Sequence, residues 1–308
     1  MTDAGTILGI DIGGTKVAAA LVDLGDQPTI KAHRSISTQP ELGRDHLLAS
    51  VSNLAVELIG ASVTPVTAVG IGSAGVIDSA SGCVISATDL IPGWAGAALG
   101  PTVATPTGLP IAVTGDVLAH ALGENVYGAG IGQSSCLVVG VGTGVGGALV
   151  ADGQVRSGEH GLAGHFGHFG HHLARDLVCS CGRRGHLEPV ASGTGIASEY
   201  QRLTGVRLNS RDVAEAAERG DSAALAVIQA AGRSLGEVLA GLTKSWDPAI
   251  IIVSGSVANA GEFWWQSLRQ GFASQAMDLV SDTPLVKGRL GGDAPLLGAA
   301  HFAKNRFF

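Results

Sequence analysis

Histidines and cysteines gather in one short stretch of the sequence, and their spacing suits a metal ion. Six of the ten histidines lie between His160 and His186, and two of the four cysteines, Cys179 and Cys181, lie among them. Two of these histidines and the two cysteines offer two imidazoles and two thiolates, enough for a closed tetrahedral Zn²⁺ site of the structural type. The four residues are His168, Cys179, Cys181 and His186. The two cysteines are too close for an ordinary disulfide. The other interpretation is a group of surface histidines beside two inert thiols.

A first glycine turn follows the first apolar segment, in the run from Asp11 to Lys16. Gly13 and Gly14 could let backbone N–H groups face a phosphate, and the Thr15 hydroxyl could donate to it. The carboxylate of Asp11 stands where it could hold a hydrated Mg²⁺ or orient the phosphates. The alternative is a plain hairpin turn with a solvated aspartate, and this motif alone does not decide between the two.

A second glycine turn lies at residues 140–147 and contains a formal G-x-G-x-x-G. A dinucleotide-binding fingerprint should open a helix, whereas residues 148–153 favour a strand and a turn. A Walker P-loop motif does not occur in the sequence either. We therefore expect Gly142, Thr143 and Gly144 to face phosphates from a hairpin. Gly255, which follows a third apolar strand, is then expected near an adenosine.

Alternating strands and helices must position these groups. Apolar runs beside glycine turns predict strands at residues 6–10, 17–22, 67–72, 137–150 (interrupted by a turn) and 249–253. Apolar periodicity predicts helices at residues 46–58, 116–127 and 221–244, the last capped by Asp221 or Ser222. Each half of the chain opens with a strand, a glycine turn and a second strand. The alternation of strands and helices indicates the α/β class.

Composition narrows the function classes. A chain of 308 residues is longer than one core usually serves, so two lobes are expected. The 47 glycines are about twice the ordinary usage, which we interpret as backbone approaching a ligand. The net charge of −7 and the absence of a basic cluster argue against a nucleic-acid partner. The sequence shows neither a signal peptide nor a long uninterrupted apolar run, so we expect a cytoplasmic protein without membrane contact.

The order of the motifs resembles the ROK family of sugar kinases and regulators over nearly the whole chain. The segments that carry the resemblance are residues 11–16, 70–75, 116, 140–147, 164–168, 179–188 and 298–300. It implies an actin-like, hexokinase-type (ribonuclease H-like) α/β fold with ATP, Mg²⁺ and a sugar in the cleft between two lobes. It also implies a homodimer. We expect a small lobe at residues 1–115 with a C-terminal helix at about 296–308, and a large lobe at 116–295 that carries the zinc loop.

The resemblance also implies roles for individual residues. Asp116 corresponds to the catalytic base that accepts a proton from the sugar hydroxyl, although an ordinary helix N-cap would be the better interpretation without the resemblance. Gly75, His165, His168 and Glu188 correspond to residues that line the sugar site. The first strand is predicted within ten residues of Met1, whereas the family's repressors carry an N-terminal DNA-binding segment, so we expect the kinase branch.

The chain departs from the family pattern at four positions. His186 replaces a third cysteine of the zinc set. His165 replaces the glutamate of glucokinases, as in bacterial N-acetylmannosamine kinases. Gly115 replaces an asparagine that holds sugar hydroxyls, and Asp89 stands where an asparagine is common.

The sequence therefore predicts an ATP-dependent kinase that phosphorylates the 6-hydroxyl of an N-acetylhexosamine, with N-acetylmannosamine the leading acceptor. The alternatives are a glucokinase or other hexose kinase, and a sugar-sensing protein that has lost turnover.

Overall fold

The computed structural model describes residues 5–25, 27–88 and 91–308, so Asp89 lies outside the described residues. The chain forms two compact units. The first comprises residues 1–132, 153–163 and 289–308, and the second comprises 133–152 and 164–288. These bounds differ from the predicted lobes, which divide at residue 115. The reason is that α3 (Asp116–Tyr127) packs on α9 (Ala294–Phe307), and both belong to the first unit.

The first unit is built on a sheet with the strand order β3-β2-β1-β4-β7. β1 (Thr6–Ile12), β2 (Lys16–Asp23) and β3 (Thr29–Ser37) pair antiparallel, whereas β4 (Val66–Ser73) and β7 (Ile111–Gly115) continue the sheet in parallel. The other elements of this unit are α1 (Arg44–Gly60), α2 (Leu99–Thr107), β5 (Val76–Asp78), β6 (Cys83–Ser86), β10 (Gln154–Val155), and the 3₁₀ helices η1 (Pro40–Leu42) and η6 (Gly291–Asp293).

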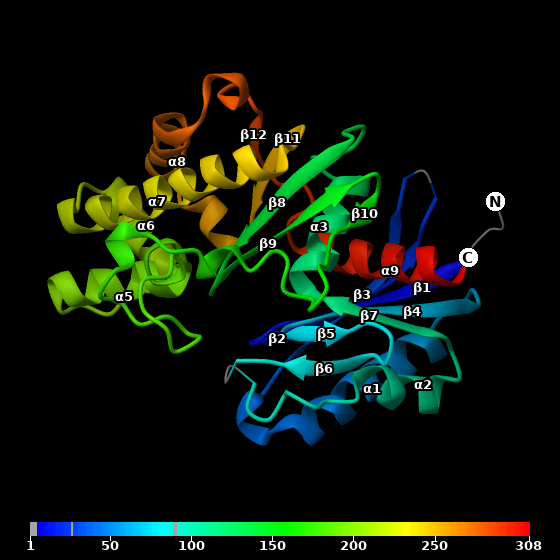
Figure 1. Ribbon diagram of the computed structural model, residues 1–308. Coiled ribbons are helices and arrows are strands. Elements are labelled where there is room, and N and C mark those ends of the chain that lie inside the picture. The colour runs from blue at the N-terminus through cyan, green and yellow to red at the C-terminus, as the bar shows by residue number, and fades with distance from the viewer. Residues whose placement is uncertain (1–4, 26, 89–90) are drawn as a thin grey trace. The chain divides into compact units, whose positions relative to one another are not determined.

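Alternation along β1 divides the apolar side chains of the first unit between two faces of the sheet. Ile10 and Ile12 pack in one core with Val51 of α1, and α2 joins the same core. Ile7 points to the opposite face, where it packs with Leu296 of α9. Figure 1 shows α1 and α2 on one side of this sheet and α9 on the other.

Several glycines serve close packing within the fold, which corrects the expectation that the glycine excess reports backbone approaching a ligand. A Cβ atom added to Gly70 of β4 would lie 1.9 Å from the carbonyl oxygen of Ala299 in α9. A Cβ atom added to Gly298 of α9 would lie 1.8 Å from the carbonyl oxygen of Ala119 in α3. α9 can therefore approach both the sheet and α3 only because these positions carry no side chain.

The second unit has a sheet in which β9 (Val145–Ala151), β8 (Ser135–Val141), β11 (Ile250–Ser254) and β12 (Leu285–Lys287) follow in that order. β8 and β9 form an antiparallel hairpin, and β11 and β12 run parallel to β8. The helices of this unit are α4 (Glu188–Ala191), α5 (Gly193–Thr204), α6 (Ser210–Glu218), α7 (Ser222–Trp246), α8 (Glu262–Gln275), and the 3₁₀ helices η2 (Phe166–His168), η3 (His172–Ala174), η4 (Ser256–Asn259) and η5 (Asp278–Val280).

The predicted elements are confirmed within the described residues. Each unit contains the predicted strand, glycine turn and strand, as β1–β2 in the first and β8–β9 in the second. α7 begins where the sequence indicated, and the carboxylate of Asp221 caps it by accepting the N–H groups of Ala223 and Ala224 at 2.9 and 3.0 Å. Local patterns of apolar residues and caps were sufficient to place these elements.

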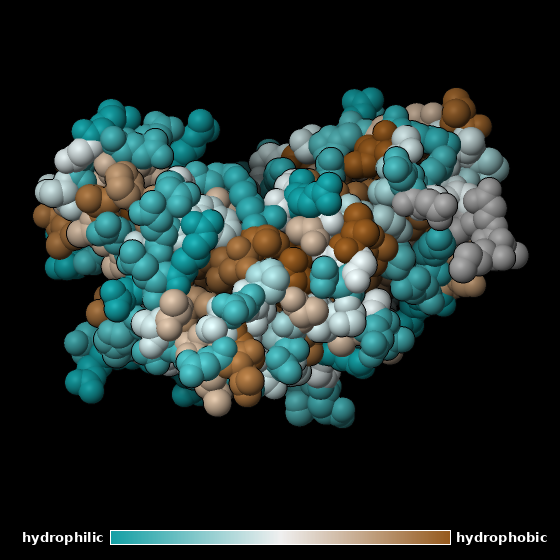
Figure 2. Space-filling view, turned by 90° about the horizontal axis from the view of Figure 1, so that it is seen from above, coloured by the Kyte–Doolittle hydropathy of each residue, from teal (hydrophilic) through white to brown (hydrophobic). Residues whose placement is uncertain are grey.

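α7 is also the one described helix that is long and apolar enough to cross a membrane by length and composition. Of its most apolar window, 56% is buried inside the structure. Its apolar stripe, including Leu235 and Leu239, belongs to the core of the second unit. On the face drawn in Figure 2, hydrophobic residues form separate groups bordered by hydrophilic ones. The hydropathy of α7 is thus accounted for by its place in the core.

Candidate active site and metal centre

Two carboxylates meet at the carboxyl edge of the first unit's sheet. Asp11 lies near the end of β1, opposite Gly72 of β4, and Asp116 follows directly after β7. A Cβ atom added to Gly72 would lie 3.4 Å from Cα of Asp116 and 3.8 Å from Oδ1 of Asp11, so both residues border this glycine. Parallel strands bring their carboxyl ends together, which is where α/β folds commonly bind ligands.

The surroundings of Asp11 disfavour its ionised form. Burial and, to a smaller extent, the negative charge of Asp116 raise the pKa of this carboxyl, Lys16 partly opposes them, and the net result is a pKa of about 7. Asp116 accepts the N–H of Val117 on Oδ1 at 2.8 Å, in the first turn of α3. A half-buried acid beside a second carboxylate is an arrangement that a cation would relieve.

The turn between β1 and β2 is held by backbone and hydroxyl bonds. The N–H of Gly13 donates to the carbonyl of Lys16 at 3.0 Å, and the Thr38 hydroxyl donates to the carbonyl of Gly13 at 2.7 Å. Thr15 and Lys16 are exposed, and Gly14 lies beside them in the turn. The predicted phosphate-facing residues of this unit therefore form a defined turn with accessible side chains next to Asp11.

Gly75 follows β4 in a left-handed conformation, with φ of 98°. The Trp94 indole N–H fixes the preceding residues by donating to the Ser73 hydroxyl and the Ala74 carbonyl, each at 3.2 Å. Gly75 is thus held in place, and its predicted contact with a sugar stays a prediction.

In the second unit the glycine turn between β8 and β9 is tied to α5. The N–H of Gly193 donates to the carbonyl of Gly142 at 2.7 Å, and the Thr194 hydroxyl donates to the carbonyl of Thr143 at 2.8 Å. Gly255 follows β11 with φ of 91°, and a Cβ atom there would lie 2.3 Å from the carbonyl of Val141. The structure therefore brings Gly255 next to the turn that carries Gly142, Thr143 and Gly144, and their shared contact with a nucleotide stays a prediction.

Glu188 joins this turn to the cysteine-rich loop. At the start of α4, its Oε2 accepts the N–H of Val145 at 3.1 Å, and its Oε1 accepts the hydroxyl of Ser180 at 2.6 Å. Ser180 is not among the predicted site residues, although its place between the predicted metal ligands Cys179 and Cys181 was a signal. His165 is exposed, and its ring lies 6.0 Å from that of His168 at an angle of 25°.

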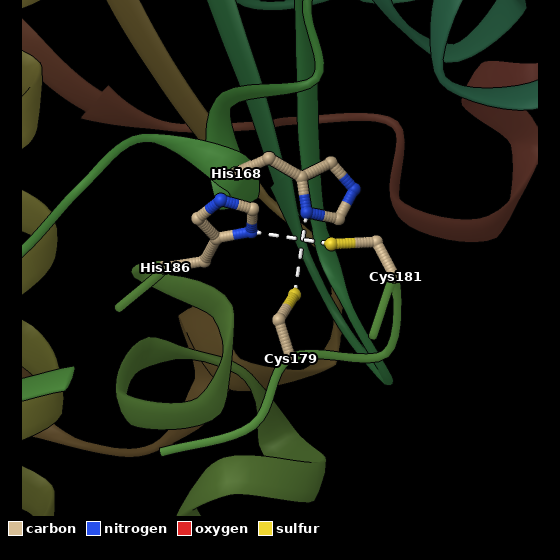
Figure 3. Close-up of side chains that lie close together, drawn as sticks. All are labelled: His168, Cys179, Cys181 and His186. Atoms are coloured by element: carbon tan, nitrogen blue, oxygen red, sulfur yellow. Dashed lines mark hydrogen bonds between the residues drawn. The ribbon is translucent and has the colours of Figure 1, made fainter. Parts of the chain in front are cut away.

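The four predicted metal ligands come together in the second unit. Figure 3 shows their donor atoms directed toward one another, and all four lie within 4.8 Å of each other. His168 Nδ1 lies 3.3 Å from Cys179 Sγ, and His186 Nδ1 lies 3.3 Å from Cys181 Sγ. A tetrahedral zinc ion would place such nitrogen and sulfur ligands about 3.6 Å apart. The donor set therefore fits zinc in both chemistry and spacing.

Backbone pairing shapes the loop that presents these ligands. Gly170 forms a bridge with His186, and Val178 forms one with Arg184. The Cys179 N–H donates to the carbonyl of Arg183 at 2.8 Å. Burial raises the pKa of the Cys179 thiol and lowers the pKa of the His168 imidazole. A metal ion would reverse the effect on the thiol, because it binds the thiolate.

The predicted site residues thus fall into two sets, each brought together within its own unit. The first unit holds Asp11, Asp116, the first glycine turn and Gly75, and the second unit holds the second glycine turn, Gly255, Glu188, His165 and the four metal ligands.

Comparison with known proteins places the chain in a family. The sequence model described as the ROK family matches residues 7–306. A glucokinase of Halalkalibacterium halodurans is 32% identical, over 97% of this chain and 95% of its own length. An N-acetylmannosamine kinase of Escherichia coli O127:H6 is 34% identical, over 97% of this chain and 98% of its own length.

A solved structure gives the same assignment. A ROK family glucokinase from Streptomyces griseus, in complex with glucose and AMPPNP, matches with a TM-score of 0.84 at 30% identity, covering 97% of this chain and 99% of that one. The chain therefore belongs to the ROK family, as an ATP-dependent carbohydrate kinase with the actin-like, hexokinase-type two-lobe fold, whose substrates are a sugar and ATP with Mg²⁺.

Proposed function

We propose that this ROK kinase phosphorylates the 6-hydroxyl of an N-acetylhexosamine, with N-acetylmannosamine as its preferred acceptor. The observation that carries this proposal is His165, an exposed imidazole beside His168 at a position where family glucokinases have glutamate. An imidazole can donate to an acetamido oxygen or pack beside its methyl group, whereas a carboxylate accepts from a free 2-hydroxyl. The relatives include both a glucokinase and an N-acetylmannosamine kinase, so the acceptor rests on this position.

In the proposed mechanism Asp116 is the general base. Its carboxylate accepts the proton of the 6-hydroxyl while that oxygen attacks the γ-phosphorus, and the bond from the γ-phosphorus to the bridging oxygen breaks, so that ADP leaves with the electron pair. Glu188, His165, His168 and Gly75 are proposed to hold the sugar. Glu188 is oriented for this by its bonds to Val145 and Ser180.

The phosphates are proposed to face the two glycine turns. Gly13, Gly14, Thr15 and Lys16 supply N–H groups, a hydroxyl and a positive charge in the first unit, and Gly142, Thr143 and Gly144 supply N–H groups in the second. Asp11 is proposed to hold Mg²⁺, which when bound neutralises phosphate charge. The raised pKa of Asp11 supports this role, because the carboxyl lacks a cationic partner strong enough to keep it ionised. Gly255 is proposed to lie at the adenosine.

The acceptor is tested by measuring ADP release from the purified chain with five sugars. The sugars are N-acetylmannosamine, N-acetylglucosamine, glucose, mannose and fructose. We expect the highest kcat/KM with N-acetylmannosamine and the loss of turnover in Asp116→Asn, which keeps the size of the side chain. A clear preference for glucose over both acetamido sugars would overturn the proposed acceptor.

A sugar-sensing protein without turnover is the second candidate, and Gly115 favours it, because a sugar-binding asparagine is expected there. Gly115 has φ of −66° and ψ of 146°, which any residue adopts, and a Cβ atom would meet only the Leu118 side chain, at 3.4 Å or more. Gly115→Asn should therefore fold normally and lower KM for the acceptor. Sugar binding without ADP release in both the wild type and this variant would support the sensor.

We also propose that His168, Cys179, Cys181 and His186 hold one structural Zn²⁺. The Nδ1 atom of His168 faces Cys179, which leaves its Nε2 atom for the sugar. The ion would then fix the ring that contacts the substrate. Elemental analysis of protein without a polyhistidine tag should find zinc, and Cys179→Ser with Cys181→Ser should lose it. Folded protein without zinc would refute this site.

Finally, we propose a cytoplasmic homodimer, which the family resemblance implies. Sedimentation equilibrium should give twice the chain mass of 30.8 kDa. Fractionation of the source cells should find the kinase in the soluble extract, and a membrane-bound fraction would contradict the proposed location.

A further inference from the structure

A second group of side chains that could hold a metal ion lies in the same unit, apart from the cysteines. His171 and His172 are adjacent at the start of η3, and Glu237 faces them from α7. His171 Nε2 lies 3.1 Å from Glu237 Oε2, and His172 Nδ1 lies 4.0 Å from the same oxygen. All three donor atoms fall within 4.8 Å of one another.

We propose that His171, His172 and Glu237 form a second zinc-binding site, with water at the fourth position. Two imidazoles and one carboxylate form a ligand set that zinc accepts in proteins. Tetrahedral bonds of ordinary length place such ligand atoms about 3.4 Å apart. The distance of 3.1 Å from His171 already fits this spacing, and His172 needs to move inward by a few tenths of an ångström.

The exposure of the three side chains suits a site that is fixed on one side and open on the other. The side chains of His171 and Glu237 are 5% and 16% exposed, so the structure holds them in place. The His172 side chain is 70% exposed, so it can rotate toward the ion and leave room for water. The ion would tie the segment that carries His168 to α7.

Arg233 orients the carboxylate and limits the affinity. Its Nε donates to Glu237 Oε1 at 3.1 Å, which leaves Oε2 for the two histidines. The positive charge of Arg233 also repels a cation, and the site contains no thiolate. Zinc is therefore held more weakly here than by the two cysteines and two histidines of the first centre.

The proton on His171 must move for the ion to bind. Burial lowers the pKa of this imidazole, which favours the neutral ring. Nδ1 accepts the N–H of Leu173 at 3.4 Å, so the proton lies on Nε2 and faces Glu237. When Nε2 binds the ion, the proton takes Nδ1, and the bond to Leu173 is lost. The Nδ1–H group and the Leu173 N–H would then both be donors, so the segment at Leu173 must turn away, which further limits the affinity of the site.

Cobalt is the probe that separates the two centres. Co²⁺ bound by thiolates gives an intense near-ultraviolet charge-transfer band, whereas Co²⁺ bound by imidazole and carboxylate gives only weak visible bands. Titration of the metal-free, untagged full chain should show two equivalents, the first with the charge-transfer band and the second without it. If the wild type bound only the equivalent that gives the charge-transfer band, the proposal would be overturned.

His172→Ala is the main variant, because its exposed side chain can be removed while the His171–Glu237 pair stays intact. It should lose the second equivalent and keep the charge-transfer band, and Glu237→Gln should do the same. His160→Ala, at another exposed histidine, should keep both equivalents. A second equivalent retained in His172→Ala would refute the site. If the cysteine centre itself fails, the band is absent while the second equivalent remains, so the two failures are distinguishable.

Discussion

Asp11 shows how a single residue can be held where its charge is disfavoured. The carboxyl is half-buried at the sheet edge, and its pKa rises to about 7 through burial and through the negative charge of Asp116. Lys16, at the start of β2, offsets only part of this effect. A shift of this size is expected where a group serves a ligand rather than the fold.

The raised pKa of Asp11 predicts a pH dependence of stability. Between about pH 4 and pH 7 the native chain keeps a proton on Asp11 that the unfolded chain loses, so this group lowers the free energy of unfolding as pH rises. Asp11→Asn removes the ionisation. The variant should gain stability relative to the wild type across this window, by about 4 kcal/mol at most.

Urea unfolding in magnesium-free buffer at about pH 5, 6.5 and 8 checks this prediction. Asp45→Asn is a suitable control, because the Asp45 side chain is 87% exposed and should show no such trend. A difference between Asp11→Asn and the wild type that stays constant with pH would contradict the assigned ionisation.

His165 should determine which sugar is preferred. His165→Glu restores the carboxylate of the family's glucokinases, so the ratio of kcat/KM for glucose to that for N-acetylmannosamine should rise by at least about tenfold. His160→Glu adds the same charge at an exposed histidine outside the proposed site and should leave the ratio unchanged. Steady-state kinetics with both sugars measures it, and an unchanged ratio in His165→Glu would remove this residue from the sugar site.

At the scale of elements, the packing of α9 depends on positions without side chains. Gly298 lets α9 approach α3, because a Cβ atom there would lie 1.8 Å from a backbone oxygen. α9 also crosses the sheet at Gly70. The sequence marks these glycines only as part of an excess, since the partner backbone comes from distant segments.

Two glycine-to-alanine changes in helices should therefore act in opposite directions. Gly298→Ala should lower the free energy of unfolding by about 1–3 kcal/mol, because α9 must shift away from α3. Gly241 of α7 has no atom within 4 Å of its added Cβ. Gly241→Ala should therefore raise the free energy of unfolding by roughly 0.5–1 kcal/mol. Denaturant unfolding measures both. If Gly298→Ala and Gly241→Ala changed the free energy of unfolding equally, α9 would be able to move away from α3 without loss of stability.

At the scale of the whole molecule, each unit has its own core. The core of the first unit includes Leu47 and Val51, and that of the second includes Leu235 and Trp264. The proposed zinc ligands all belong to the second unit. Removal of the metal should therefore affect the unfolding of the second unit, and a substitution in the core of the first unit should affect the unfolding of the first.

Calorimetry should resolve this separation as two thermal transitions. Removal of zinc by a chelator should lower the Tm of one transition, because the ion stabilises only the loop of the second unit. Leu47→Ala, in the first unit, should lower the Tm of the other transition, with a cost of about 2–5 kcal/mol. A single transition that responds equally to both changes would show instead that the two units unfold as one.

The sequence by itself determined what depends on residues close together in the chain. The two strand–turn–strand hairpins, α7 with its Asp221 cap, and the set of two histidines and two cysteines follow from local spacing and periodicity. The order of the motifs along the chain resembles that of the ROK family, and the match of the family model to residues 7–306 confirms this assignment. The acceptor sugar rests on one residue type at one position, His165, and stays a proposal.

Tertiary structure alone decided which distant residues meet. It placed α3 in the first unit, brought Asp11 and Asp116 close to Gly72, and set Glu237 beside His171, 66 positions away in the chain. It also assigned glycines to helix packing where composition suggested a ligand. The physical reason is that these contacts arise when sheets and helices pack, and packing depends on the shapes of surfaces that no local pattern contains.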